Sequence, residues 1–330
     1  MIQHPGILAL LLASGLVSLL LLGAGWQGQR ILRGWDLRSG SEGQLDLERR
    51  TYLVSTLVAN ALVIQILSLS LFIFTADGLH TQFVGAMCAA GSLAANTFGY
   101  PTLLFKIGTC LVAGIWLILN RADTQGYNYP LIRPKYVLLL ILVPLVLAET
   151  WLQARYLMGL KADVMTSCCG SLFGQGRQGF AAELAGLPPR VMQPAFWTTF
   201  LALLLAGVIL VRFRRGAALF SLLSLTFLSV SVASLVSFFC LYIYALPTHH
   251  CPFCLLQREY GFVGYPLYGA LLGGAIAGLG VGTLAPFRTQ QSLVDTLPRT
   301  QARLTWMALA LAVLFTLIVG CWMLLSPLKL

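Results

Sequence analysis

The sequence reads Thr248-His249-His250-Cys251-Pro252-Phe253-Cys254-Leu255-Leu256-Gln257-Arg258-Glu259 between two long apolar runs, at about residues 218–246 and 261–283. Each run is long enough to cross a bilayer, because a helix of about 20 apolar residues spans the hydrocarbon core. The polar stretch between the runs therefore predicts a turn at a membrane surface that carries a Cys-x-x-Cys pair. Two thiols at this spacing can close a disulfide within one turn and exchange two electrons without large movement.

The whole chain shares this apolar character. Of its 330 residues, 58% are hydrophobic and 10% are charged, whereas a soluble domain carries about 25% charged residues. Eight apolar segments predict an all-α, polytopic helical bundle in a lipid bilayer. They lie at about residues 6–26, 52–75, 101–120, 136–156, 195–213, 218–246, 261–283 and 304–326.

The basic residues predict the orientation of these segments. The net charge of +10 comes from arginines in short loops, which indicates topology and not a nucleic-acid surface. The positive-inside rule makes alternate loops cytoplasmic and places both termini outside, in a multi-pass inner-membrane protein whose cysteine loops face the periplasm. The residues that define the cytoplasmic side are Arg30, Arg33, Arg38, Arg49, Arg50, Arg121, Arg133, Lys135, Arg212, Arg214, Arg215, Arg288, Arg299 and Arg303.

This topology separates the cysteines into two groups. Three lie inside expected helices, where a thiol behaves as a small apolar group; they are Cys110, Cys240 and Cys321. The other five fall in or beside external segments, where disulfides form and persist; they are Cys88, Cys168, Cys169, Cys251 and Cys254.

The first external segment, residues 76–100, contains His80 and Cys88. Its small-residue stretch, residues 85–95, predicts a short re-entrant or interfacial helix, which a membrane protein tolerates where protein or water covers it. His80 and Cys88 are candidates for a metal or haem ligand or for a partner thiol. The interpretation that we favour is a packed lid.

The largest external loop, residues 157–194, contains the adjacent pair Cys168 and Cys169. Adjacent cysteines can form a strained disulfide, and strained, exposed disulfides are the labile and reactive ones. The alternative is a structural bridge that holds this loop, for example to Cys88. Both interpretations remain open.

His249 and His250 stand directly before the Cys-x-x-Cys pair. Together with Cys251 and Cys254 they offer ligands for zinc or copper, but four ligands within six residues make a poor tetrahedral cage. We therefore assign no metal ligand, and we interpret the histidines as groups that tune the thiolate or mark the interface. If Cys254 lies in the first turn of the next helix, the helix dipole also stabilises its thiolate.

Three ionisable residues fall in or near the expected spans, where charges are costly and often functional. Lys106 and Arg155 lie close to segment ends and are expected to snorkel to the interface. Glu149 is a candidate proton carrier, but we rank a pairing with a basic residue of a neighbouring helix first.

The string from Cys251 to Arg258 resembles the Cys-x-x-Cys-x-x-x-Arg motif of the quinone-linked disulfide generators of the DsbB type. That resemblance implies that Cys251 and Cys254 are the redox pair and that Arg258 lies beside a ubiquinone or menaquinone. From their place beside the pair, we add His249 and His250 as candidate cofactor-binding residues. A cation there favours both the thiolate and the quinone anion.

The order of elements resembles the related vitamin K epoxide reductase family. In that family a helix leads to an external cysteine loop, two helices follow, and a Cys-x-x-Cys opens the next. The resemblance implies a four-helix redox core at residues 136–283, flanked by a three-helix region at 1–135 and by a loop and last helix at 284–330. It also implies that Cys168 and Cys169 relay electrons from a soluble external thiol–disulfide protein. In the family the loop cysteines are separated, whereas here they are adjacent.

The function that these observations favour is a membrane thiol–disulfide oxidoreductase that passes electrons between external thiols and a quinone. A transporter or assembly subunit that handles a soft metal or haem is the first alternative, because thiolates and imidazoles on one face would serve as entry ligands. A structural subunit of a larger membrane complex is the second.

Overall fold

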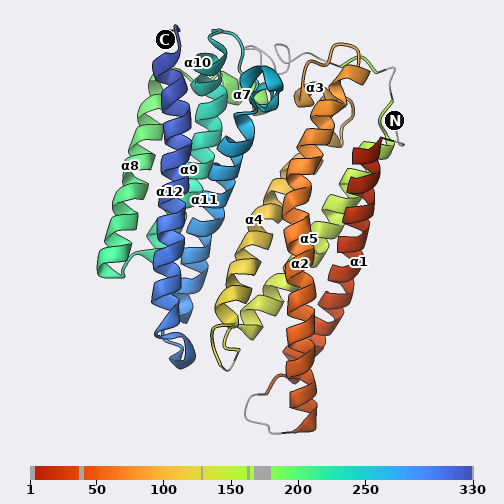
Figure 1. The fold of residues 1–330 in the computed structure, drawn as a ribbon, viewed down its shortest axis with the longest axis vertical. Coiled ribbons are helices and arrows are strands. Elements are labelled where there is room, and N and C mark those ends of the chain that lie inside the picture. Colours follow the sequence, from red (N-terminus) through yellow and green to blue (C-terminus); the bar gives the residue numbers. More distant parts are fainter. Residues whose placement is uncertain (1–3, 37–40, 128, 162–163, 167–179, 329–330) are drawn as a thin grey trace. The chain divides into compact units, whose positions relative to one another are not determined.

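The computed structural model describes residues 4–36, 41–127, 129–161, 164–166 and 180–328. Over these residues the chain is helical with no β-strand, and an isolated bridge joins Val84 and Met165. Eight helices are long and apolar enough to cross a membrane (Figure 1), which confirms the predicted all-α polytopic bundle. They are α1 (Pro5–Gly34), α2 (Glu42–Gly78), α4 (Gly99–Asp123), α5 (Ile132–Met158), α8 (Pro189–Phe213), the continuous α9 (Ala217–Ser234), η2 (Leu235–Phe239) and α10 (Cys240–Tyr244), α11 (Gly264–Leu284), and α12 (Thr296–Leu325).

Shorter helices lie between the spans. The predicted short helix in residues 85–95 is present as α3 (Ala89–Ala94). The others are η1 (His80–Gln82), α7 (Phe180–Ala185), η3 (Cys254–Leu256), η4 (Arg258–Tyr260), η5 (Ala285–Phe287) and η6 (Gln291–Leu293). The side of the membrane on which each loop lies stays a prediction.

The chain divides into two compact units by its internal contacts. Unit 1 comprises Met1–Phe72, Thr97–Leu160 and Thr283–Gln301, and unit 2 comprises Ile73–Asn96, Lys161–Gly282 and Ala302–Leu330. Within unit 1, α5 packs on α1 and α4; the expected redox core at residues 136–283 stays a prediction.

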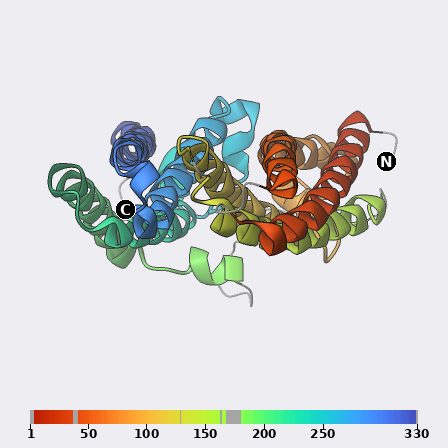
Figure 2. The ribbon, with the colours of Figure 1, turned by 90° about the horizontal axis from the view of Figure 1, so that it is seen from below.

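Unit 1 is built from α1, α2, α4 and α5. Figure 2 shows α1, in red, running along α5, in lime. Each of the four helices contributes to one apolar core, for example through Leu21, Leu62, Trp116 and Tyr136. Burial of these side chains holds the unit together, since helices in lipid associate through close packing and interhelical hydrogen bonds.

A buried polar network crosses unit 1. The ammonium of Lys106 lies 2.7 Å from a carboxylate oxygen of Glu149, which also accepts from the Gln65 amide at 2.6 Å. Thr109 donates to the second carboxylate oxygen, and Lys106 also donates to Ser68 at 3.0 Å. The pairing that we ranked first for Glu149 is therefore confirmed.

The prediction that Lys106 snorkels to the interface is wrong, because its side chain is 1% exposed. A buried carboxylate attracts it inward, since each charge would be costly alone in hydrocarbon. Arg155 lies instead over the rings of Phe98 and Trp151, 5.1 and 5.9 Å from their centroids.

Unit 2 contains α8, α9, α11 and α12. Their core is an aromatic cluster in which Phe196 contacts Phe200, Phe227, Phe239 and Phe315. On α11, a Cβ added to Gly278 or Gly282 would collide with a serine side chain of α9. These two helices therefore approach closely, as small residues allow in membranes.

The sixth span changes its winding as it nears the Cys-x-x-Cys segment. Its last part is the π-helical turn η2, followed by α10, and every residue from Leu235 to Tyr244 is buried. Single π-helical turns occur often at functional sites. Ala245 then ends the span in the left-handed region, at φ 52°, and the chain turns into the segment that carries Cys251.

Candidate three-cysteine site

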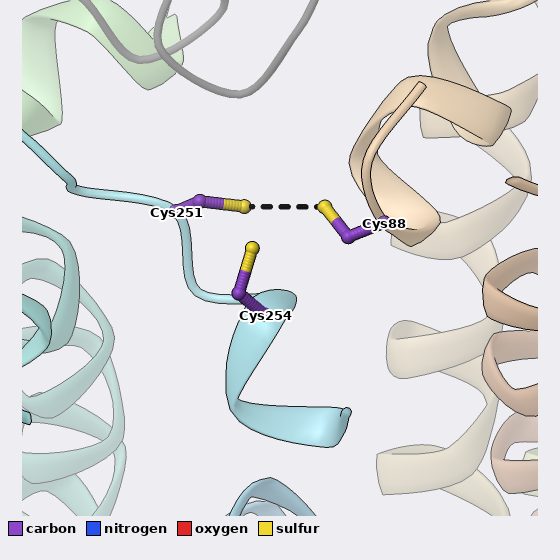
Figure 3. Close-up of side chains that lie close together, drawn as sticks. All are labelled: Cys88, Cys251 and Cys254. Atoms are coloured by element: carbon purple, nitrogen blue, oxygen red, sulfur yellow. Dashed lines mark hydrogen bonds between the residues drawn. The ribbon is translucent and has the colours of Figure 1, made fainter. Parts of the chain in front are cut away.

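Three cysteine side chains of unit 2 converge on one point (Figure 3). The sulfurs of Cys88, Cys251 and Cys254 all lie within 4.8 Å of one another, and those of Cys88 and Cys251 are 3.6 Å apart. The relative exposures of the three residues are 0%, 0% and 5%. A disulfide needs a sulfur–sulfur distance of about 2.05 Å, so within the described part of the chain these are close thiols and not a bonded pair.

The Cys-x-x-Cys pair lies on a loop and not at the start of a spanning helix. Cys254 opens the short helix η3, and α11 begins only at Gly264. Gly261 and Phe262 take positive φ angles of 63° and 56°, which interrupts a helical path between the two. The condition under which the dipole of the next span would stabilise the Cys254 thiolate, a place in its first turn, is therefore not met.

Two tyrosines and a cysteine hold this loop by its backbone. The Tyr244 hydroxyl donates to the Cys251 carbonyl at 2.6 Å, and the Cys240 thiol donates to the same oxygen at 3.7 Å. The Tyr268 hydroxyl donates to the Pro252 carbonyl at 2.5 Å. The loop is thus fixed to α10 and α11, which limits the freedom of the Cys251 sulfur.

The two histidines have different surroundings. His249 is half-buried, and its Nε2 lies 3.4 Å from the Cys254 sulfur. Its ring packs edge-on against Tyr244, with centroids 4.6 Å apart. Burial lowers the pKa of His249, and the positive charge of a protonated His250 lowers this pKa further. The negative charge of a Cys88 thiolate raises it in part. His249 is therefore an uncharged imidazole at neutral pH, able to exchange a proton with Cys254.

The ring of His250 binds the π-helical turn η2. It is buried, with 6% exposed, and its Nδ1–H donates to the Val236 carbonyl at 2.8 Å. Because η2 winds with i→i+5 hydrogen bonds, its carbonyl groups are arranged differently from those of an α-helix. His250 thereby connects the loop to η2.

Cys88 is held in place on both sides. It is the N-cap residue of α3. The next residue, Ala89, donates its backbone N–H to the Asp77 carboxylate at 3.0 Å, and the preceding residue, Met87, accepts at its carbonyl from the Gln257 amide at 2.7 Å. Gln257 belongs to the Cys-x-x-Cys segment, so it connects the two cysteine-bearing segments directly. We call Asp77 and Gln257 the Cys88 clamp.

The Cys88 segment also contacts the chain that leads to the Cys168 and Cys169 loop. The Thr166 backbone N–H donates to the Val84 carbonyl at 2.9 Å. Gly85, at φ 88°, has its missing Cβ directed at the Thr166 carbonyl, only 2.5 Å away, so a side chain there would break this contact. The backbone just before Cys168 in the sequence is thus bound to the segment of Cys88.

The residues predicted from sequence are only partly brought together. Cys251, Cys254 and His249 meet at the site, whereas Arg258 is exposed on η4. Cys168 and Cys169 lie outside the described residues. His80 points its Nδ1 at the Asp77 carbonyl.

The sequence makes Cys88 a candidate ligand or partner thiol, but we favoured a packed lid. Its predicted place on the same side of the membrane as Cys251 was the signal that could have included it. Other members of the site were not named. Asp77, Tyr244, Gln257 and Tyr268 had no recognisable pattern, because each acts through one hydrogen bond to a backbone group.

Comparisons with models of protein families, with curated proteins and with solved structures give no match.

The arrangement supports two kinds of chemistry. Cys251 is close enough to both Cys88 and Cys254 to exchange partners in a disulfide, which needs one thiolate beside a sulfur–sulfur bond. Three sulfurs around a common point can also hold a soft metal ion.

Proposed function

We propose that the protein is a membrane thiol–disulfide oxidoreductase whose centre is the trio Cys88, Cys251 and Cys254. The single observation that carries the proposal is the convergence of the three sulfurs, from segments 163 residues apart. In this arrangement Cys251 is the shared sulfur, because it can bond to Cys88 on one side and to Cys254 on the other.

The exchange starts from a Cys251–Cys254 disulfide. The Cys88 thiolate attacks the Cys251 sulfur, a Cys88–Cys251 bond forms, and Cys254 leaves as a thiolate. His249, 3.4 Å from the Cys254 sulfur, supplies a proton to it or removes one. One thiolate of the incoming dithiol then attacks the Cys88 sulfur, which forms a mixed disulfide, releases Cys251 as a thiolate and leaves the Cys251–Cys254 pair reduced. The donor's second thiolate attacks its own sulfur in the mixed disulfide, which completes the donor's disulfide and releases Cys88 as a thiolate.

A two-electron acceptor restores the centre. The reduced pair gives two electrons and two protons to a quinone, the Cys251–Cys254 bond re-forms, and a quinol leaves. The net reaction converts an external dithiol and a quinone into a disulfide and a quinol. The quinone and the role of Arg258 rest on the resemblance of the Cys-x-x-Cys-x-x-x-Arg string.

A relay is needed between this centre and a protein partner. Cys88 is fully buried, so a folded protein cannot bring its own thiol to it directly. Cys168 and Cys169 suit that relay, since they follow Thr166 in the sequence and Thr166 binds the Cys88 segment at Val84. The small-molecule reductant dithiothreitol should bypass the relay, whereas reduced thioredoxin, used as a bulky dithiol probe, should require it.

The test is quinone reduction by the purified full-length protein in detergent. We expect one quinol for each two thiols lost, and we expect Cys251→Ser and Cys254→Ser to abolish the reaction. Cys168→Ser/Cys169→Ser should block thioredoxin as donor but keep dithiothreitol. Cys321→Ser, on an exposed cysteine of α12, is the matched control.

Arg258 has its own comparison in the same assay. Arg258→Ala should slow the quinone step and leave the exchange between Cys88 and Cys251 unchanged, with Arg212→Ala as a control at a distant exposed arginine. Quinone reduction that continues without Cys251 and Cys254 would refute the proposed function.

A further inference from the structure

We propose that the thiolates of Cys88, Cys251 and Cys254 bind one soft divalent cation of the Zn²⁺ or Cd²⁺ class, with the imidazole of His249 as a fourth ligand. This metal site does not depend on the exchange reaction. It concerns a second state of the same sulfurs, in which no disulfide is present.

The sulfur spacing fits a single ion. A zinc–thiolate bond is about 2.3 Å, so two sulfurs on one tetrahedral zinc lie about 3.8 Å apart. The Cys88 and Cys251 sulfurs are 3.6 Å apart, and all three lie within 4.8 Å. The three sulfurs are thus already near the spacing of a metal-bound set, and His249 Nε2 lies 3.4 Å from the Cys254 sulfur.

The ligands come from two separate segments. The sequence alone offers four ligands within six residues, which makes a poor cage, and for that reason we assigned no metal there. Cys88 adds a ligand from a second segment: it lies at the N-terminus of α3 and faces Cys251 across the site (Figure 3). Three cysteines and one histidine are a common ligand set of tetrahedral zinc sites.

The donor atoms and the burial select the class of ion. Thiolates prefer soft or borderline cations over Mg²⁺ or Ca²⁺. Three thiolates carry three negative charges, so a divalent ion leaves a net charge of −1 and a monovalent ion leaves −2. A buried site disfavours the larger residual charge, which favours a divalent ion over Cu⁺.

The surrounding residues orient the ligands. Asp77 and Gln257, the Cys88 clamp, fix the backbone on each side of Cys88, and Tyr244 fixes both the Cys251 carbonyl and the His249 ring. Residues that fix metal ligands in this way keep them in position, and their mutation typically lowers metal affinity by about 10–100-fold.

Metal binding and disulfide exchange exclude each other. Three thiols lose three protons as three sulfur–metal bonds form, and no electron moves. The metal-loaded centre therefore has no thiolate available to attack a disulfide, and the disulfide form has too few thiolates to hold the ion. An ion at this site would switch the exchange off in a reducing, metal-rich state.

The experiment uses the full-length protein in detergent, fully reduced and without oxygen. Zn²⁺ is titrated against a chromophoric chelator, and Cd²⁺ is titrated while the cadmium–thiolate absorbance and the released protons are recorded. We expect one ion per chain, three protons released per ion, and protection of the three thiols from alkylation. X-ray absorption of the bound Zn²⁺ should show three sulfurs and one nitrogen, and His249→Ala should remove the nitrogen.

Two variants separate loss of a ligand from loss of folding. Cys88→Ser should lower the Zn²⁺ affinity by more than about 100-fold, which is the largest loss typical of a residue that only supports a ligand. Cys88→His should keep most of the affinity, because the imidazole replaces the lost ligand. Cys321→Ser, at the exposed cysteine of α12, should bind as the wild type does. Wild-type protein that takes up no stoichiometric ion, or a Cys88→Ser protein that binds equally well, would overturn the metal site. Neither result would affect the exchange reaction, which is measured by quinone reduction.

Discussion

Replacing Gln257 by alanine should lower the effective concentration of the Cys88 thiol at the Cys251 sulfur. The Gln257 amide donates to the Met87 carbonyl at 2.7 Å, and this hydrogen bond joins the two cysteine-bearing segments. A net hydrogen bond of this kind contributes about 0.5–1.5 kcal/mol. Its loss should therefore lower the effective concentration of the Cys88 thiol at Cys251 by about 2- to 13-fold.

The assay measures that effective concentration directly. In a Cys254→Ser background, the fraction of Cys88–Cys251 disulfide is determined in glutathione redox buffers by alkylation and mass spectrometry. Gln82→Ala, at an exposed glutamine of η1 in the same connection between α2 and α4 as Cys88, is the matched control and should leave the value unchanged. An equal value in wild-type and Gln257→Ala proteins would show that the Cys88 clamp does not position Cys88.

Three further perturbations follow from the packing. Lys106→Met should destabilise the protein by about 3–5 kcal/mol, because it leaves the buried Glu149 charge without its ammonium; adding Glu149→Leu should restore most of that loss in thermal unfolding, and a single variant as stable as the double variant would contradict the pairing. Tyr244→Phe should cost about 0.5–1.5 kcal/mol, because the Cys251 carbonyl keeps the Cys240 thiol as a donor, and it should speed alkylation of the Cys251 thiol; an unchanged rate would mean that this hydrogen bond does not hold the loop. Gly278→Leu should cost about 1–3 kcal/mol by overpacking the contact of α11 with α9, and unfolding at the wild-type temperature would argue against that close approach.

Much of the fold was predictable because the signal for a spanning helix is local. A run of about 20 apolar residues needs no partner to be recognised, and each of the eight runs falls on an observed helix. The pairing of Glu149 was also predictable, since a carboxylate inside a membrane requires a partner. Which base would pair with it was not, and Lys106 was expected to point to the interface.

The site was less predictable because it depends on contacts between distant segments. The Cys-x-x-Cys spacing identified Cys251 and Cys254, but the third sulfur comes from a segment 163 residues earlier in the chain. No sequence pattern connects Gln257 with the Met87 carbonyl. The separation of the Cys-x-x-Cys segment from α11 was not predictable either, because the positive φ of Phe262 is unusual for a bulky residue and has no signature in the sequence.

The central claim, that Cys251 exchanges partners between Cys88 and Cys254, is tested most directly by disulfide trapping in native membranes. Cells that express the wild type or Cys254→Ser are quenched in acid, their thiols are alkylated, and the disulfides are mapped by mass spectrometry. Without Cys254, the Cys88–Cys251 bond has no internal thiol to reopen it, so it should accumulate in Cys254→Ser and be rare in the wild type. A Cys88 thiol that is fully alkylated in both proteins would contradict the account.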